Sequence, residues 1–188
     1  MAATDTEQFN PEGYFAFDMA RGQVQARGGD RVLVLSGDAV GPLVSTAVKH
    51  GDLTTVRALG RKIGEHAQAS LGGNATAASP EQVATHAGGV LALLGWGRLT
   101  LERWGKALVV TVKGAPTLDG PHLGMAALLG GMLSAMSGRD IACVPVGEEG
   151  QFLVVAPSVA EQVWGWAKET PEVGSLVARL APKAGADA

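Results

Sequence analysis

The chain has 188 residues, which suits one domain of ordinary size. Its 15 basic and 18 acidic residues give a formal net charge of −3, so it lacks the excess positive charge that nucleic-acid binding requires. A hydrophobic fraction of 46% excludes a disordered chain. We therefore expect a single domain over residues 1–188, with flexible ends at 1–12 and 182–188.

The single cysteine, Cys143, excludes an internal disulfide and a multi-thiolate zinc site. The first residues carry no basic and apolar segments of the kind found in signal peptides. The longest apolar stretch, Leu123–Met136, is shorter than the ~20 residues that a membrane span needs. We expect a cytoplasmic protein with no membrane span and no cofactor.

The first half of the sequence predicts a small β unit followed by two helices. Residues 13–35 look like short strands joined by turns, and Arg31–Leu35 reads as a buried strand. A first helix begins near Ser36 or Asp38 and is expected to pack through Val40, Leu43, Val44, Ala47 and Val48.

A second helix covers about 52–71, with Leu53, Val56, Leu59, Ile63 and Ala67 at helical spacing. Gly60 and Gly64 lie four residues apart on one face of it. Because glycine lowers helix propensity, this pair predicts the close approach of another backbone.

The second half of the sequence predicts helices and hairpins in alternation. Ser79 and Pro80 begin a third helix, which ends at Gly95. A hairpin follows over 98–113, then a buried apolar helix over 123–137, then a second hairpin over 141–156. Ser158 and Glu161 form the pattern of a capping box for a helix to about 168, and a last short helix is expected over 172–180. Hairpins pair antiparallel, so the fold class is α+β: an antiparallel sheet of hairpins packed with helices.

No constellation of residues predicts catalysis. The sequence has no phosphate-binding loop, no Gly-x-Gly-x-x-Gly turn, no His-Glu-x-x-His pair and no Gly-x-Ser-x-Gly elbow. No credible nucleophile–base pair is present. We therefore expect a protein that is not an enzyme.

The candidate ligand-binding residues are mostly large and apolar. Large aromatic side chains beside glycine line apolar clefts, although they also serve as core or dimer-interface anchors. Methionines on the apolar helix supply adaptable packing. A histidine on the third helix is either a core residue, a pocket residue or a haem ligand. These candidates are His86, Trp96, Trp104, Met125 and Met132.

Three segments of the second half resemble the 4-vinyl reductase domain family: Leu94–Arg103 (LGWGRLTLER), Leu108–Pro116 (LVVTVKGAP) and Leu129–Ile141 (LGGMLSAMSGRDI). Upstream, the motifs at Arg21-Gly22, Arg31–Leu35 and Leu59–Gly64 resemble the start of related effector-sensing domains of bacterial activators that respond to aromatic compounds. Subunits of the TRAPP tethering complex share this architecture. The resemblance covers most of residues 20–157.

The resemblance implies an α+β domain that dimerises through helices and often holds a buried apolar ligand pocket. Members of the family frequently bind zinc through cysteines around the last hairpin, where this sequence has only Cys143; we therefore expect no zinc site of that type. The sequence also has no ATPase or DNA-binding segment, so we do not expect a complete activator. Sensing would have to be relayed by dimerisation or by a partner protein.

Three functional hypotheses follow. The first is a non-catalytic homodimeric regulatory or scaffold module that binds a small apolar ligand, a partner protein, or both. The second is an enzyme acting on a tetrapyrrole-like or other hydrophobic substrate, with His86 or His66 moving protons. The third is a haem-based sensor with a pocket histidine. We rank them in this order.

Overall fold

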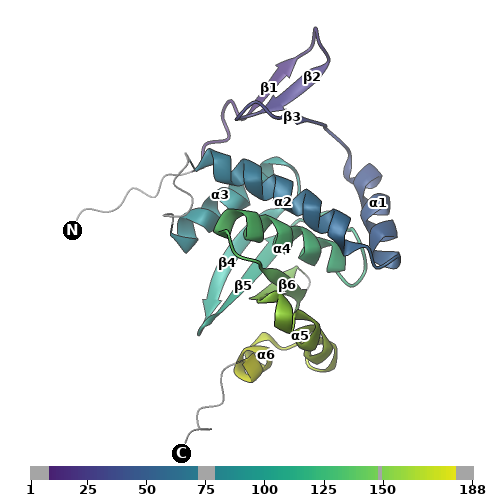
Figure 1. The fold of residues 1–188 in the computed structure, drawn as a ribbon, viewed down its shortest axis with the longest axis vertical. Helices are drawn as coiled ribbons and strands as arrows, with labels where there is room; N and C mark the ends of the chain where they lie inside the picture. Colours follow the sequence, from purple (N-terminus) through teal and green to yellow (C-terminus); the bar gives the residue numbers. More distant parts are fainter. Residues whose placement is uncertain (1–8, 72–78, 148–149, 181–188) are drawn as a thin grey trace, which may run out of the picture.

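The computed structural model describes residues 9–71, 79–147 and 150–180. It has an α+β fold, as the sequence predicts. At the N-terminal end, a small antiparallel sheet stands at one end of the molecule and is joined to the body by an extended segment (Figure 1). This sheet contains β1 (Phe15–Asp18), β2 (Gln23–Ala26) and β3 (Arg31–Val32), in that order. Helix α1 (Gly37–Lys49) follows the extended segment.

The body is a four-stranded antiparallel sheet with helices on both faces. The strands are β4 (Arg98–Trp104), β5 (Ala107–Lys113), β6 (Ala142–Pro145) and β7 (Gln151–Val155), in the spatial order β4-β5-β7-β6. One face carries α2 (Leu53–Ser70), α3 (Pro80–Leu93) and α4 (Leu123–Ser137). The other face carries α5 (Pro157–Glu169) and α6 (Val173–Leu180).

Alternation along the central strands builds two apolar layers. Val110 and Phe152 face α2, α3 and α4, whereas Val109 and Leu153 face α5 and α6. All four side chains are almost completely buried. Because successive side chains of a strand point to opposite faces, a central strand covered on both faces needs a continuous apolar run, which β5 has from Ala107 to Val110.

Helices α2 and α4 cross at backbone distance, which confirms the close approach predicted at Gly60 and Gly64. A Cβ added at Gly60 would lie 1.9 Å from the Leu128 carbonyl oxygen, and one at Gly64 would lie 2.4 Å from the Met132 carbonyl oxygen. On α4, a Cβ at Gly131 would lie 2.1 Å from the Arg57 carbonyl oxygen. Glycines of both helices therefore permit the crossing.

The structure confirms one predicted cap and corrects another. The Ser79 hydroxyl accepts a hydrogen bond from the Gln82 amide at 3.2 Å, and the Gln82 side chain accepts one from the Ser79 amide at 2.9 Å. The capping box predicted at Ser158 is wrong, because α5 already begins at Pro157. Proline has a fixed φ and no amide hydrogen, so it is favoured at the first helical position, and Ser158 falls inside the first turn.

The predicted buried strand over Arg31–Leu35 is also corrected. Only Arg31 and Val32 pair with β2, and the next three residues lie exposed: Leu33 at 78%, Val34 at 76% and Leu35 at 59%. β2 extends only one residue, Gln23, beyond Val24, which lies opposite Val32, so it offers no partner to Val34 or Leu35.

Two residues expected on packed helix faces are exposed as well: Leu43 on α1 at 67% and Leu59 on α2 at 41%. Val44 and Val56, also expected on these faces, are buried as predicted.

Two further points concern the chain as a whole. Within the described residues, no helix combines the length and the apolar character needed to cross a membrane. Most of the flexible ends expected at 1–12 and 182–188 lies outside the described residues.

Candidate functional site

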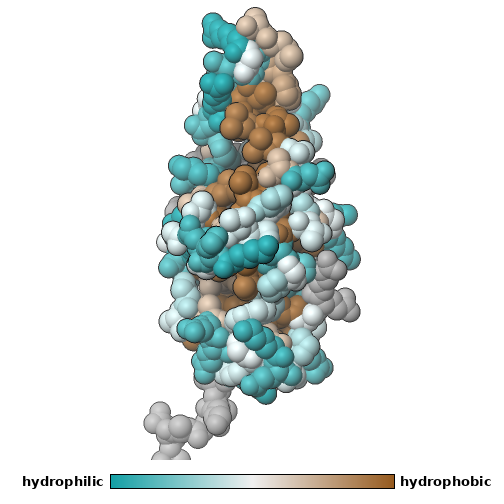
Figure 2. Space-filling view, turned by 90° about the vertical axis from the view of Figure 1, so that its right-hand side faces the viewer, coloured by the Kyte–Doolittle hydropathy of each residue, from teal (hydrophilic) through white to brown (hydrophobic). Residues whose placement is uncertain are grey.

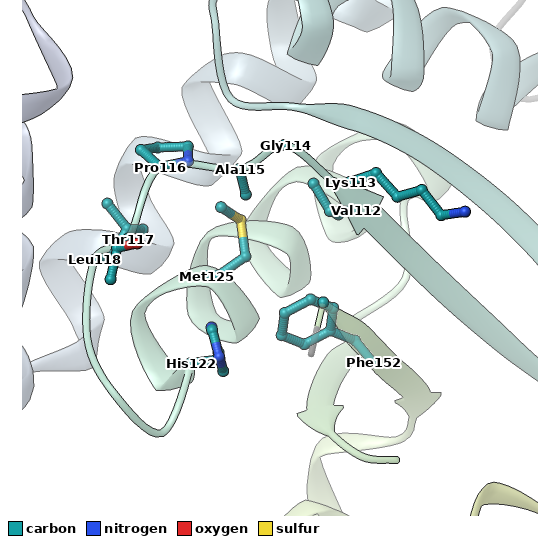
Figure 3. A pocket seen from close by; sticks show the side chains of 11 residues that line it. Val112, Lys113, Gly114, Ala115, Pro116, Thr117, Leu118, His122, Met125 and Phe152 are labelled. Atoms are coloured by element: carbon teal, nitrogen blue, oxygen red, sulfur yellow. The ribbon is translucent and has the colours of Figure 1, made fainter. Parts of the chain in front are cut away.

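A cavity of about 380 Å³ lies at the end of the sheet, where β5 leads into α4. Its floor consists of three apolar side chains: Val112 at the end of β5, Met125 in the first turns of α4, and Phe152 on β7. They are only 4%, 3% and 1% exposed. In Figure 3 the Met125 side chain points toward Ala115 in the connecting segment, and the Phe152 ring lies below and beside it. The alternation of β5 and β7 places Val112 and Phe152 on the helical face, where α4 meets them.

The wall of the cavity is the connecting segment from Gly114 to Leu118. Polar groups lie along its rim, where Thr117 and His122 contribute groups able to form hydrogen bonds. The Lys113 side chain points away from the cavity (Figure 3). His122 also borders a second hollow of about 310 Å³ that reaches Trp164. The site thus combines an apolar interior with a few polar groups at its edge, the usual composition of a small-molecule pocket.

A buried carboxylate holds the far end of this wall in place. Asp119 is 8% exposed, and its two carboxylate oxygens accept hydrogen bonds from the amides of Leu123 at 2.7 Å and Gly124 at 2.9 Å. It therefore satisfies two of the unpaired amides at the start of α4 and places a negative charge at the positive end of the helix dipole. His122, directly before the helix, has a left-handed backbone with φ of 57° and makes no side-chain cap.

Asp119 is not among the candidates that the sequence suggested. The preference for aspartate concerns the N-cap position, which His122 occupies here, so the local pattern gave no direct signal for Asp119.

Two close backbone contacts fix the remaining sides of the cavity. The Val112 amide donates a 2.8 Å hydrogen bond to the Gly150 carbonyl, and a Cβ added at Gly150 would lie 2.5 Å from the Val112 carbonyl oxygen. Helix α1 packs on the outer side of the wall, where a Cβ added at Gly41 would lie 3.3 Å from the Thr117 carbonyl oxygen. The cavity is therefore shaped by segments that lie far apart in the sequence, from α1 to the turn before β7.

Of the five ligand-binding candidates, Met125 lines this cavity and the other four lie elsewhere. His86 is 5% exposed on α3, and its Nδ1 lies 3.1 Å from the Gln82 carbonyl oxygen. Trp96, partly buried, packs against the main core after α3. Met132 is fully buried where α4 meets α2.

Trp104 is 41% exposed at the end of β4, and its indole N–H donates to Glu102 at 3.2 Å. The observed cavity lies at the start of the apolar helix α4, and no residue of α3 lines it.

The described residues contain no cluster of three or more histidine, cysteine, aspartate or glutamate side chains that could hold a metal ion. Cys143 lies buried on β6, and burial raises the pKa of its thiol from 9.0 to about 12, an effect that the nearby Arg57 opposes. At neutral pH the group is therefore an apolar thiol rather than a nucleophilic thiolate.

Comparison with protein-family models and with curated proteins gave no match. Among solved structures, the fold is similar to the phenol-responsive sensory domain of the transcription activator PoxR, in its crystal structure with phenol. The TM-score is 0.57 at 14% sequence identity, and the alignment covers 90% of this chain and 92% of that chain.

This likeness fits the expected relation to effector-sensing domains, and no comparison supports the 4-vinyl reductase or TRAPP families. The chain therefore shares the α+β fold of a phenol-responsive sensory domain.

Proposed function

We propose that this chain is a non-catalytic regulatory module that binds a small, largely apolar ligand, about the size of one aromatic ring, in the cavity beside Met125. The apolar floor of that cavity is the observation that carries the proposal, since Val112, Met125 and Phe152 meet at a hollow of about 380 Å³. This volume falls within the usual range for small-ligand pockets, roughly 300–1,000 Å³. The similar PoxR domain was solved with phenol, which makes phenol the natural first probe.

In this proposal the protein acts in the cytoplasm as a homodimer, and ligand binding is relayed through the dimer or to a partner protein. The rim groups of Thr117 and His122 would orient a hydroxyl or similar polar group of the ligand, while the floor takes up its ring. A single ring offers few atoms for contact, so we expect a dissociation constant of roughly 10 µM to 1 mM.

The test is calorimetric titration of the purified chain with phenol, toluene and indole. Ala115 lines the wall of the cavity and is partly exposed, so Ala115→Phe fills the cavity from a position that tolerates a larger side chain. We expect this variant to bind at least tenfold more weakly. Ala178→Phe is the matched control, because Ala178 is an exposed residue of α6, away from the cavity.

A second readout is thermal stability, because a ligand that binds only the folded chain raises it by about 2.7 kcal/mol at 100 times its dissociation constant. The proposal fails if none of the three probes saturates. It also fails if binding is unchanged in Ala115→Phe, or if Ala178→Phe weakens it equally.

A further inference from the structure

The extended segment between β3 and α1 exposes three consecutive apolar residues. Leu33, Val34 and Leu35 are 78%, 76% and 59% exposed, and Leu43 on α1 is 67% exposed. We call these four residues the apolar strip. Figure 2 views the side on which this segment and α1 lie in Figure 1, and apolar side chains gather there from the small N-terminal sheet downward. Runs of three exposed apolar residues are unusual on a monomeric surface.

The backbone of the strip is unpartnered too. Within the described part of the chain, pairing with β2 ends at Val32, and Leu33, Val34 and Leu35 form no backbone hydrogen bond. β3 is the edge strand of its sheet. Valine and leucine in an extended edge segment, with no charge and no proline, make a ready template for strand addition.

We propose that a second copy of this chain covers the apolar strip, and that the two copies pair antiparallel along Val32–Leu35. A two-fold axis between Leu33 and Val34 places Val32 of one copy opposite Leu35 of the other, so the same patch meets itself. The segment Val32–Leu35 carries no charged residue, so the two identical segments do not repel each other when they pair. The pairing joins the two small sheets into one.

The exposed apolar area of the strip is close to the apolar area that one partner of a stable dimer interface buries. The four residues of the strip present on the order of 400 Å² of apolar surface. A standard interface buries about 800 Å² per partner, a little over half of it apolar. The strip therefore supplies about the apolar share that one partner of such an interface contributes.

Helix α1 connects this surface with the ligand cavity, a step that rests on the proposed function. α1 begins at Gly37, two residues after Leu35, and its Gly41 packs on the carbonyl of Thr117 in the cavity wall. One turn later, Val44 packs on Gly124 at the start of α4, where an added Cβ would lie 2.4 Å from a Val44 methyl group. Docking at the strip and ligand in the cavity therefore act on the same N-terminal half of α1, and each is expected to change the affinity of the other.

The experiment measures self-association by sedimentation over a hundredfold range of concentration. Val34→Asp places an unpaired carboxylate in the paired strand, and Leu33→Lys does so with an ammonium group. Both sites are exposed in the monomer, so circular dichroism spectra should match that of the parent chain. Met19→Asp is the matched control, since Met19 is 85% exposed but lies in the β1–β2 turn, outside the strip.

We expect the parent chain and Met19→Asp to be dimers, and both strip variants to self-associate about 100-fold more weakly or worse. A monomeric parent chain overturns the inference. So does a strip variant that remains as tight a dimer as the parent, or a control that dissociates equally.

Phenol titrations of the dimeric parent and the monomeric Val34→Asp variant test the role of α1. We expect at least a threefold difference in phenol affinity. By linkage the dimer dissociation constant should then change at least about ninefold at saturating phenol, because each dimer binds two phenol molecules. Equal phenol affinities would remove the coupling while leaving the interface. If phenol binds neither form, the proposed function fails for this probe, and the sedimentation result still decides the interface.

Discussion

The crossing of α2 and α4 makes a sharp stability prediction, with Gly60→Ala as the perturbation. The added Cβ would lie 1.9 Å from the Leu128 carbonyl oxygen and 2.7 Å from its carbon. These are backbone atoms, which cannot rotate away as a side chain can. An ordinary contact at about 3.4 Å or more requires the helices to separate locally by roughly 1.5 Å, and tightly packed interiors resist such shifts.

The expected magnitude follows from two opposing contributions. Overpacking typically costs about 1–3 kcal/mol, and a collision between two backbones, as here, about 2–4 kcal/mol. Replacing glycine by alanine within a helix contributes about 1 kcal/mol in the other direction. We expect a net loss of about 1–3 kcal/mol, which lowers the melting temperature by roughly 3–10 °C in a chain of this size.

Gly165→Ala is the matched control. Gly165 lies inside α5, is exposed, and a Cβ added there meets nothing within 4 Å. It should gain about 0.5–1 kcal/mol from helix propensity alone. Thermal and urea unfolding monitored by circular dichroism compare the two variants with the parent chain. A Gly60→Ala variant as stable as the parent, or more stable, would refute the close crossing.

Three other substitutions test the site and the core. Asp119→Ala removes the cap of α4 and should lower the free energy of unfolding, measured in urea, by about 1–2 kcal/mol. It should also weaken phenol binding at least tenfold. Unchanged binding would show that the cavity wall does not depend on the cap. Arg57→Met should cost about 1–3 kcal/mol, because its Nη2 donates to Ser134, Asp140 and the Ile141 carbonyl, while the more exposed Arg61→Met should stay within about 0.5 kcal/mol. Equal losses in the two arginine variants would contradict this.

Cys143 gives a prediction in pH, because burial raises the pKa of its thiol from 9.0 to about 12. The unfolded chain loses this proton first, so the contribution to stability is complete below pH 9.0 and falls as the pH rises toward 12, by up to roughly 4 kcal/mol. Urea unfolding of the parent chain and of Cys143→Ala between pH 8 and pH 11 should therefore converge as the pH rises; parallel curves would count against a buried thiol.

The sequence alone determined most of the secondary structure and the fold class. The apolar run Leu123–Ser137, the valine-rich β5 and the Ser79 cap are local signals, since periodicity and capping act within a few residues of the chain. The spacing of Gly60 and Gly64 also predicted a close backbone contact. It could not say that α4 is the partner, because that depends on which helices share a face of the sheet.

Only the tertiary structure decided where the candidate site lies. Met125 was selected from the sequence, but its partners in the cavity are Val112, from the preceding strand, and Phe152, from a strand beyond α4. The wall between them is held by Asp119 and covered by α1, contacts that no local pattern encodes.

The segment Leu33–Leu35 is a second case in which the sequence could not decide the tertiary environment. Its residue types predict a buried strand, and locally that prediction is sound. Burial, however, needs a partner, and β2 pairs no further than Val32. The sequence therefore determined that this segment is apolar and extended, while the fold decided that it lies at an open edge of the sheet, because pairing is a property of two segments rather than of one.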